Sequence, residues 1–129
     1  MKLKAMAKEG SSMGTFCGEL FACANLIKLA HLKVKGAGAY AQHVALGEIY
    51  DSVSDMADDI TETIQGYEGI LTISIPAVSY TEPLAYLKSE RTKMIAAKSK
   101  FASMPDIANK IDELIGVFSK GIYKLENLA

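Results

Sequence analysis

Apolar residues recur at spacings of three and four along most of the chain, which is the period of an α-helix with one buried face. The two clearest stretches cover residues 13–34 and 39–65. Pro83 and Pro105 each open a further stretch, at a position where the first turn of a helix accepts proline. Two glycines within residues 35–38 end the first stretch and favour a tight hairpin. The pattern predicts four helices.

Residues 66–81, between the second and third predicted helices, do not follow the helical period. From Leu71 to Ile75 apolar and hydroxyl residues alternate as in a β-strand, but no second strand is available for pairing, so we expect an extended connector. A helix over 39–65 is roughly 40 Å long, and the connector can reach roughly 50 Å, enough to return along the bundle. The fold class predicted is all-α: a ferritin-like four-helix bundle with one long crossover between helices two and three.

The length and composition indicate one domain with an ordinary core. The chain has 129 residues, half of them hydrophobic, and a formal net charge of -1, so neither disorder nor a general attraction to nucleic acid or membrane is expected. We expect the bundle to occupy residues 13–129 and residues 1–12 to form a flexible tail. Lys2, Lys4 and Lys8 in this tail allow weak DNA binding at most.

The cysteines and the most apolar segment indicate where in the cell the protein is located. Cys17 and Cys23 lie six positions apart, on different faces of a helix, and two cysteines make no secreted disulfide framework. Both are expected to be buried free thiols. Polar and charged residues interrupt the apolar run over 16–32, so it is expected neither to span a membrane nor to export the chain. A cytoplasmic protein is predicted.

Two histidines and two carboxylates form a candidate metal-ligand set. His31 and His43 bracket the hairpin, at the same height on adjacent antiparallel helices, and Asp58 and Glu62 follow one turn apart on the second helix. Imidazole and carboxylate together suit iron or zinc. The plain alternative is that His31 bonds to a neighbouring carbonyl and that the acids form a solvated face.

A polar seam on the second helix carries most of these groups. Its members, which fall on one side of the helix away from the core face, are His43, Gly47, Asp51, Ser54, Asp58 and Glu62. Gly47 and Ser54 are small where a solvated helix favours long polar side chains, and glycine in a helix costs about 1 kcal/mol relative to alanine. We therefore expect something, such as another chain, to pack closely there.

The spacing along the second helix predicts a site shared between chains. His43 and Asp58 lie fifteen positions apart, roughly 22 Å along the helix, so they cannot hold one ion within one chain. In an antiparallel pair of chains, the histidines of each meet the carboxylates of the other, which gives two sites about a two-fold axis. Phe21, Leu26 and Leu32 also lie outside the first helix's main stripe, so we expect a homo-oligomer built on a two-fold dimer.

The series His31-Leu-Lys-Val-Lys-Gly36, His43 and Asp58-x3-Glu62 resembles the ferroxidase segment of Dps proteins, the small ferritins of starved bacteria. The resemblance implies a ferritin-like fold and iron binding by His31, His43, Asp58 and Glu62 across a dimer. It also implies a ferroxidase-type activity that oxidises Fe(II) with peroxide or oxygen. The final helix is weakly similar to the last Dps helix.

Three departures from the Dps pattern leave the activity open. Gly47 stands where Dps proteins place a ligating aspartate, Leu32 replaces an aromatic residue, and the connector lacks a short helix. Asp51, one turn along the seam, is the nearest substitute ligand. Residues 40–51 also resemble uncharacterised small proteins encoded by phages. The alternative is therefore a phage-encoded structural or interaction protein with a ferritin-like fold and no catalytic activity.

Overall fold

The computed structural model describes the backbone of residues 2–128 and the side chains of residues 13–128. Its helices are α1 (Lys2–Lys33), α2 (Ala39–Glu68), α3 (Pro83–Ala97), the 3-10 turn η1 (Lys98–Phe101) and α4 (Pro105–Asn127). No strand occurs within this part of the chain, so the prediction of an all-α, four-helix protein is confirmed. Across the described residues, no helix combines the length and apolar character needed to cross a membrane.

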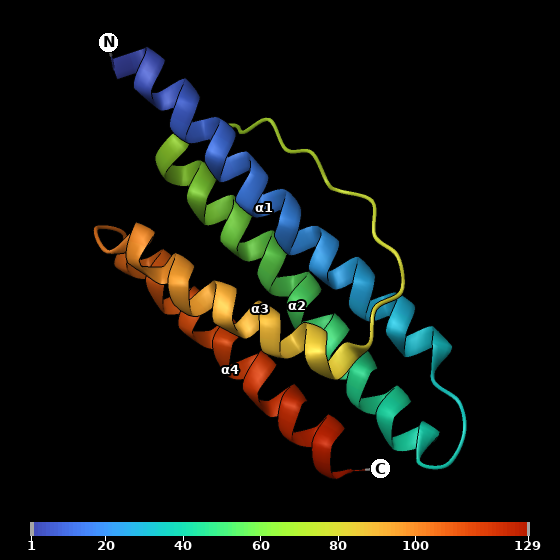
Figure 1. Ribbon diagram of the computed structural model, residues 1–129. Helices are drawn as coiled ribbons and strands as arrows, with labels where there is room; N and C mark the ends of the chain where they lie inside the picture. The colour runs from blue at the N-terminus through green and yellow to red at the C-terminus, as the bar shows by residue number, and fades with distance from the viewer. Residues whose placement is uncertain (1, 129) are drawn as a thin grey trace.

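The helices form two antiparallel hairpins joined by one long crossover (Figure 1). α1 packs on α2, α2 packs on α4, and α4 packs on α3. After α2, residues 69–82 return along α1 to the opposite end of the bundle, so that α3 runs in the same direction as α2 (Figure 1). Gly36 and Gly38 take φ values of 96° and 75° in the α1–α2 hairpin, a conformation that favours glycine.

The core is made by the apolar faces that the helical period predicts. Buried residues on α2 and α4 include Leu46, Ile49, Val53, Ile60, Ile64, Ile107, Ile111, Leu114 and Phe118. On α1, Leu20 and Ile27 face the same core. The third helix departs from prediction at Ile95, which is exposed, because the buried face of α3 passes through Leu87 and Met94 instead.

Helix α1 begins at Lys2 instead of residue 13. Residues 2–9 are alanine, leucine, methionine, lysine and glutamate, all strong helix formers, and this propensity extends the helix although the segment has no regular apolar stripe. The expected DNA contacts of Lys2, Lys4 and Lys8 involve side chains outside the described residues.

The crossover lies directly against the backbone of α1. A Cβ atom at Gly14 would overlap the carbonyl oxygen of Thr72, and a Cβ atom at Gly18 would overlap that of Ser74. Glycine at these two helix positions therefore lets the connector approach α1 more closely than any side chain would allow.

The second half of the crossover covers part of the apolar surface that the sequence leaves on α1. Residues 76–79 line a cavity together with Ala22 and Leu26, and both of these α1 residues are buried. Leu32 remains 64% exposed. The sequence predicts that a second chain covers Leu26 and Leu32. In the structure the connector covers Leu26 and leaves Leu32 exposed.

Candidate metal centre

The structure brings His31 of α1 and His43 of α2 into direct contact across the hairpin. Their rings stack with centroids 3.7 Å apart and an angle of 21° between the ring planes. Nδ1 of His31 bonds to the carbonyl oxygen of His43 at 2.7 Å, and Nδ1 of His43 bonds to the carbonyl oxygen of His31 at 2.9 Å. The expectation that the two histidines converge at the hairpin is met.

These reciprocal bonds define which nitrogen of each ring can bind a metal. A carbonyl oxygen can only accept, so Nδ1 must carry a proton in both rings, and in the neutral imidazole the lone pair is then on Nε2. Histidine ligands of metals are commonly oriented in this way, by donating the other ring N–H to a carbonyl. Because the rings are nearly parallel, their Nε2 lone pairs do not converge on one ion.

Gly47 makes room for this stacked pair. A Cβ atom at position 47 would lie 3.0 Å from Cε1 and 3.3 Å from Nδ1 of His31. The sequence predicts that another chain packs against Gly47, but in the structure the His31 ring of the same chain occupies this space. The absence of an aspartate here, where the Dps pattern has one, follows from the same crowding.

The carboxylates lie apart from the histidines, as their spacing predicts. Asp51, Asp58 and Glu62 are exposed on α2, and none of them forms an ion pair with another residue whose side chain is described. Their neighbour Asp59 instead accepts from Nζ of Lys110 on α4 at 2.7 Å. Within residues 13–128, no group of three or more His, Cys, Asp or Glu side chains is placed to hold a metal ion. A metal ion at these residues would therefore need ligands from a second chain or from solvent.

The surface around the histidine pair is apolar and basic. Leu32, Tyr40 and Val44 are exposed beside it, Tyr40 by 81%. Lys28 and Lys33 also lie at this end of the bundle, each with its ammonium group over a tyrosine ring, at 4.7 Å and 5.7 Å from the ring centroids. Exposed aromatic and apolar side chains that lie together are typical of a surface that is covered in an assembly.

Comparison with known proteins places these elements in one family. Residues 31–125 match the family described as a family of unknown function, DUF5856. The chain belongs to this family. The matched region begins at His31 and contains every candidate ligand, together with α2, α3 and nearly all of α4. No curated protein and no solved structure matches the chain.

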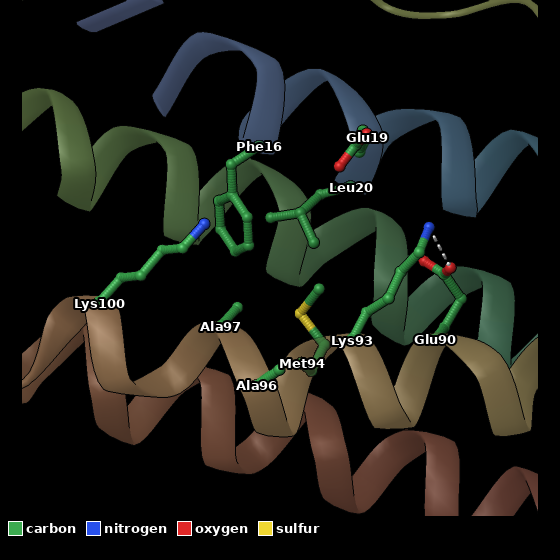
Figure 2. Close-up of a pocket in the computed structure, with 9 residues that line it drawn as sticks. All are labelled: Phe16, Glu19, Leu20, Glu90, Lys93, Met94, Ala96, Ala97 and Lys100. Atoms are coloured by element: carbon green, nitrogen blue, oxygen red, sulfur yellow. Dashed lines mark ion pairs between the residues drawn. The ribbon is translucent and has the colours of Figure 1, made fainter. Parts of the chain in front are cut away.

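This DUF5856 member also has a groove that sequence reasoning missed, between α1 and α3 (Figure 2). The groove has a volume of about 300 Å³, and its apolar lining includes Phe16, Leu20, Met94 and Ala97. Glu90 on α3 is buried beside it and forms an ion pair with Lys93 at 3.1 Å. Glu90 stands between Leu87 and Met94 on the core face of α3, and a charge at that position is the sequence signal that could have found it.

Glu90 belongs to a buried polar cluster with Cys23 and Tyr86. Burial, together with the Glu90 charge, raises the pKa of the Cys23 thiol to about 12. Burial and the nearby Cys23 and Glu90 raise the pKa of the Tyr86 hydroxyl well above its ordinary value. Cys17 and Cys23 are both buried free thiols, as predicted. A protonated, buried thiol is a poor nucleophile, so the cluster is structural in character.

The basic residues of α3 and η1 are largely neutralised within the chain. Lys88, Lys93 and Lys98 form ion pairs with Glu126, Glu90 and Asp112. Arg91 keeps its charge and donates a hydrogen bond to the hydroxyl of Ser119. Charges that are already paired release few counterions from a nucleic acid. This surface therefore offers no continuous basic patch for phosphates.

Proposed function

We propose that this protein binds iron or zinc at sites shared between two copies of the chain, as a ferritin-like protein of the Dps type. The observation that carries the proposal is the stacked pair of His31 and His43, in which each ring donates Nδ1–H to the other's carbonyl. Both Nε2 atoms are thereby kept as free ligands at one end of the bundle.

The helix topology supports a ferritin-like assignment. α1 and α2 form one antiparallel pair, α3 and α4 form another, and the long crossover over 69–82 joins the pairs (Figure 1). A single crossover between the second and third helices is the arrangement of ferritin-like bundles, in which metal ligands project from facing helices.

Charge and shape favour an antiparallel dimer through α2. The hairpin end carries Lys28, Lys33 and the exposed Tyr40, whereas the other end of α2 carries Asp58 and Glu62. An antiparallel arrangement sets the basic, apolar end of one chain against the acidic end of the other. Asp58 and Glu62 of the partner subunit would then supply the carboxylates that each histidine pair lacks.

The chemistry proposed is slow oxidation of Fe(II), with iron as the substrate. Two Fe(II) ions each give up one electron, and one hydrogen peroxide takes both electrons and two protons to form two water molecules. The histidines and carboxylates hold the ions near each other, and two-metal sites keep their ions about 3.5–4 Å apart. Because position 47 is glycine, the site lacks one carboxylate ligand. We therefore expect the site to bind iron but to oxidise it slowly.

Metal titration by calorimetry, with zinc and with anaerobic Fe(II), tests this proposal. Wild type is expected to bind metal as a dimer. His31→Ala or Asp58→Ala should each weaken binding by at least about 10–100-fold, the loss that follows removal of an outer-shell partner alone. Glu113→Ala removes an exposed acid on α4, away from the seam, and should bind like wild type. If wild type binds neither metal, the proposal is wrong and the alternative of a non-catalytic structural or interaction protein gains support.

We further propose that the protein acts in the cytoplasm. Its two cysteines are free and buried, which suits a reducing compartment.

A further inference from the structure

Residues 71–75 of the crossover form an extended segment whose backbone has few partners. Among the described residues, the N–H of Leu71 donates to Oε1 of Gln65 at 3.0 Å, and the backbone groups of residues 72–75 make no hydrogen bond. Thr72, Ser74 and Ile75 are exposed. The segment has the composition of a β-strand, rich in isoleucine and threonine, but no strand lies beside it.

The contact with α1 determines which edge of this segment is free. The carbonyl groups of Thr72 and Ser74 face Gly14 and Gly18. In an extended chain, successive peptide groups point to opposite edges. The N–H groups of Ile73 and Ile75 and the carbonyl groups of residues 71, 73 and 75 therefore point away from α1. These are the groups that an antiparallel strand would bond.

The free edge lacks the features that normally prevent pairing. Natural edge strands carry charged side chains, bulges or proline that discourage contact with another chain. Residues 69–81 contain no charged residue, and the first proline is Pro76, beyond the segment. Ile70 is 95% exposed, the most exposed large hydrophobic residue in the described chain. This edge is open to a second strand.

We propose that residues 71–75 pair antiparallel with the same segment of a second copy, about a two-fold axis at Ile73. In the sequence Leu-Thr-Ile-Ser-Ile, apolar and hydroxyl side chains alternate in the same order whichever end it is read from. Pairing would set Leu71 against Ile75 of the partner subunit on one face and Thr72 against Ser74 of the partner subunit on the other. Such apolar and hydroxyl pairs stabilise antiparallel ladders.

The hydrogen bonds of this ladder are available without breaking any existing bond. Ile73 would exchange two N–H···O bonds with Ile73 of the partner subunit. The Ile75 N–H would donate to the Leu71 carbonyl of the partner subunit, and the two-fold axis repeats that bond. The Leu71 N–H keeps its bond to Gln65, so the Ile75 carbonyl of the partner subunit gains no bond in this ladder.

This contact is separate from the dimer proposed for metal binding. The connector contacts Gly14 and Gly18 on either side of Ile73. Because α1 and α2 form an antiparallel hairpin in which His31 stands level with His43, these glycines stand level with Asp58. The middle of the seam between His43 and Glu62 is roughly 8 Å further along the bundle, at about 1.5 Å per residue. The two contacts therefore use different two-fold axes, and either can form without the other.

Disulfide trapping in the presence of a metal chelator tests the pairing directly. In the proposed register, residues 72 and 74 of opposite chains form a non-hydrogen-bonded pair with Cα atoms about 4.5 Å apart, within disulfide range. Two copies of residue 72 would lie roughly 8 Å apart, beyond that range. In a mixture of Thr72→Cys and Ser74→Cys chains, the disulfide between the two variants should therefore form about tenfold faster than the disulfide between two copies of the same variant. The reason is that pairing raises the effective concentration of the two thiols.

The matched control uses Ala77→Cys and Ser79→Cys, two exposed positions on the same connector beyond Pro76. This pair should show no preference for the mixed disulfide. Preferential homodimers of Thr72→Cys would overturn the proposed register. If the mixed disulfide forms at equal rates in the test and control pairs, pairing between two copies of the chain is wrong. The free edge would then be open only to a strand from another protein.

Amide hydrogen exchange gives an independent readout on the unmodified chain. The N–H groups of Ile73 and Ile75 should become more protected as the protein concentration rises, while that of Ser74, which faces α1, should not. Protection that is independent of concentration would contradict the pairing.

Discussion

The imidazole rings of His31 and His43 stack with their centroids 3.7 Å apart, and each ring donates Nδ1–H to the other residue's carbonyl oxygen. This relationship joins the end of α1 to the start of α2 and fixes the tautomer of both rings. It also explains why position 47, one turn beyond His43, is glycine. The local fold and the proposed chemistry therefore depend on the same pair.

Replacing Gly47 should disturb this pair. Gly47→Asp, which restores the carboxylate of the Dps pattern, places a Cβ atom 3.0 Å from Cε1 of His31, so the ring must shift by a few tenths of an ångström and its hydrogen bond to His43 is expected to weaken. Nitrogen-15 spectra of the imidazoles at pH 8 should show the Nδ1–H tautomer for both histidines in wild type. They should show a loss of that tautomer for His31 in Gly47→Asp. Unchanged spectra would mean that the ring tolerates the side chain.

The glycines under the crossover should resist substitution. Gly14→Ala and Gly18→Ala must push the connector off α1, and each is expected to lower the free energy of unfolding by about 1–3 kcal/mol. Gly116→Ala is the control, because nothing lies within 4 Å of a Cβ atom at that exposed position on α4. It should raise the stability by about 0.5–1 kcal/mol through helix propensity. Urea unfolding measures the free energy of unfolding of the three variants. If all three substitutions change it equally, the connector does not lie against α1 as described.

The buried thiol of Cys23 predicts a loss of stability at alkaline pH. Burial raises its pKa from the ordinary value of 9.0 to about 12 in the folded chain, so between these values the unfolded chain loses this proton and the folded chain keeps it. The stabilisation is complete below pH 9 and declines as the pH rises, by up to about 1.4 kcal/mol per pH unit. Urea unfolding between pH 8 and 10 should show this decline in wild type and a shallower one in Cys23→Ser. Parallel curves for the two proteins would rule out Cys23 as its source.

The number of helices and their buried faces could be predicted from the sequence because periodicity is a local signal. The apolar spacing identified Leu46, Val53 and Phe118 as core, and all three are fully buried. The start of α1 could not be found in this way, because residues 2–9 form helix by propensity and have no regular apolar face to detect.

The candidate site was predicted in part. Spacing alone brought His31 and His43 together, since a short hairpin fixes the height of residues on either side of it. The reason for Gly47 was not visible, because a pattern shows that a residue is small but not which side chain fills the space. Glu90 was missed for a related reason. Its burial depends on the meeting of α1 and α3, which are distant in the sequence.

Metal binding by a mixture of two complementary variants tests the shared site most directly. One chain carries His31→Ala and His43→Ala, the other carries Asp58→Ala and Glu62→Ala, and each alone should bind zinc poorly. Mixed dimers should regain one intact site each, because one chain supplies both carboxylates and the other both histidines. If the mixture binds no better than its components while wild type binds well, the site is not shared between chains.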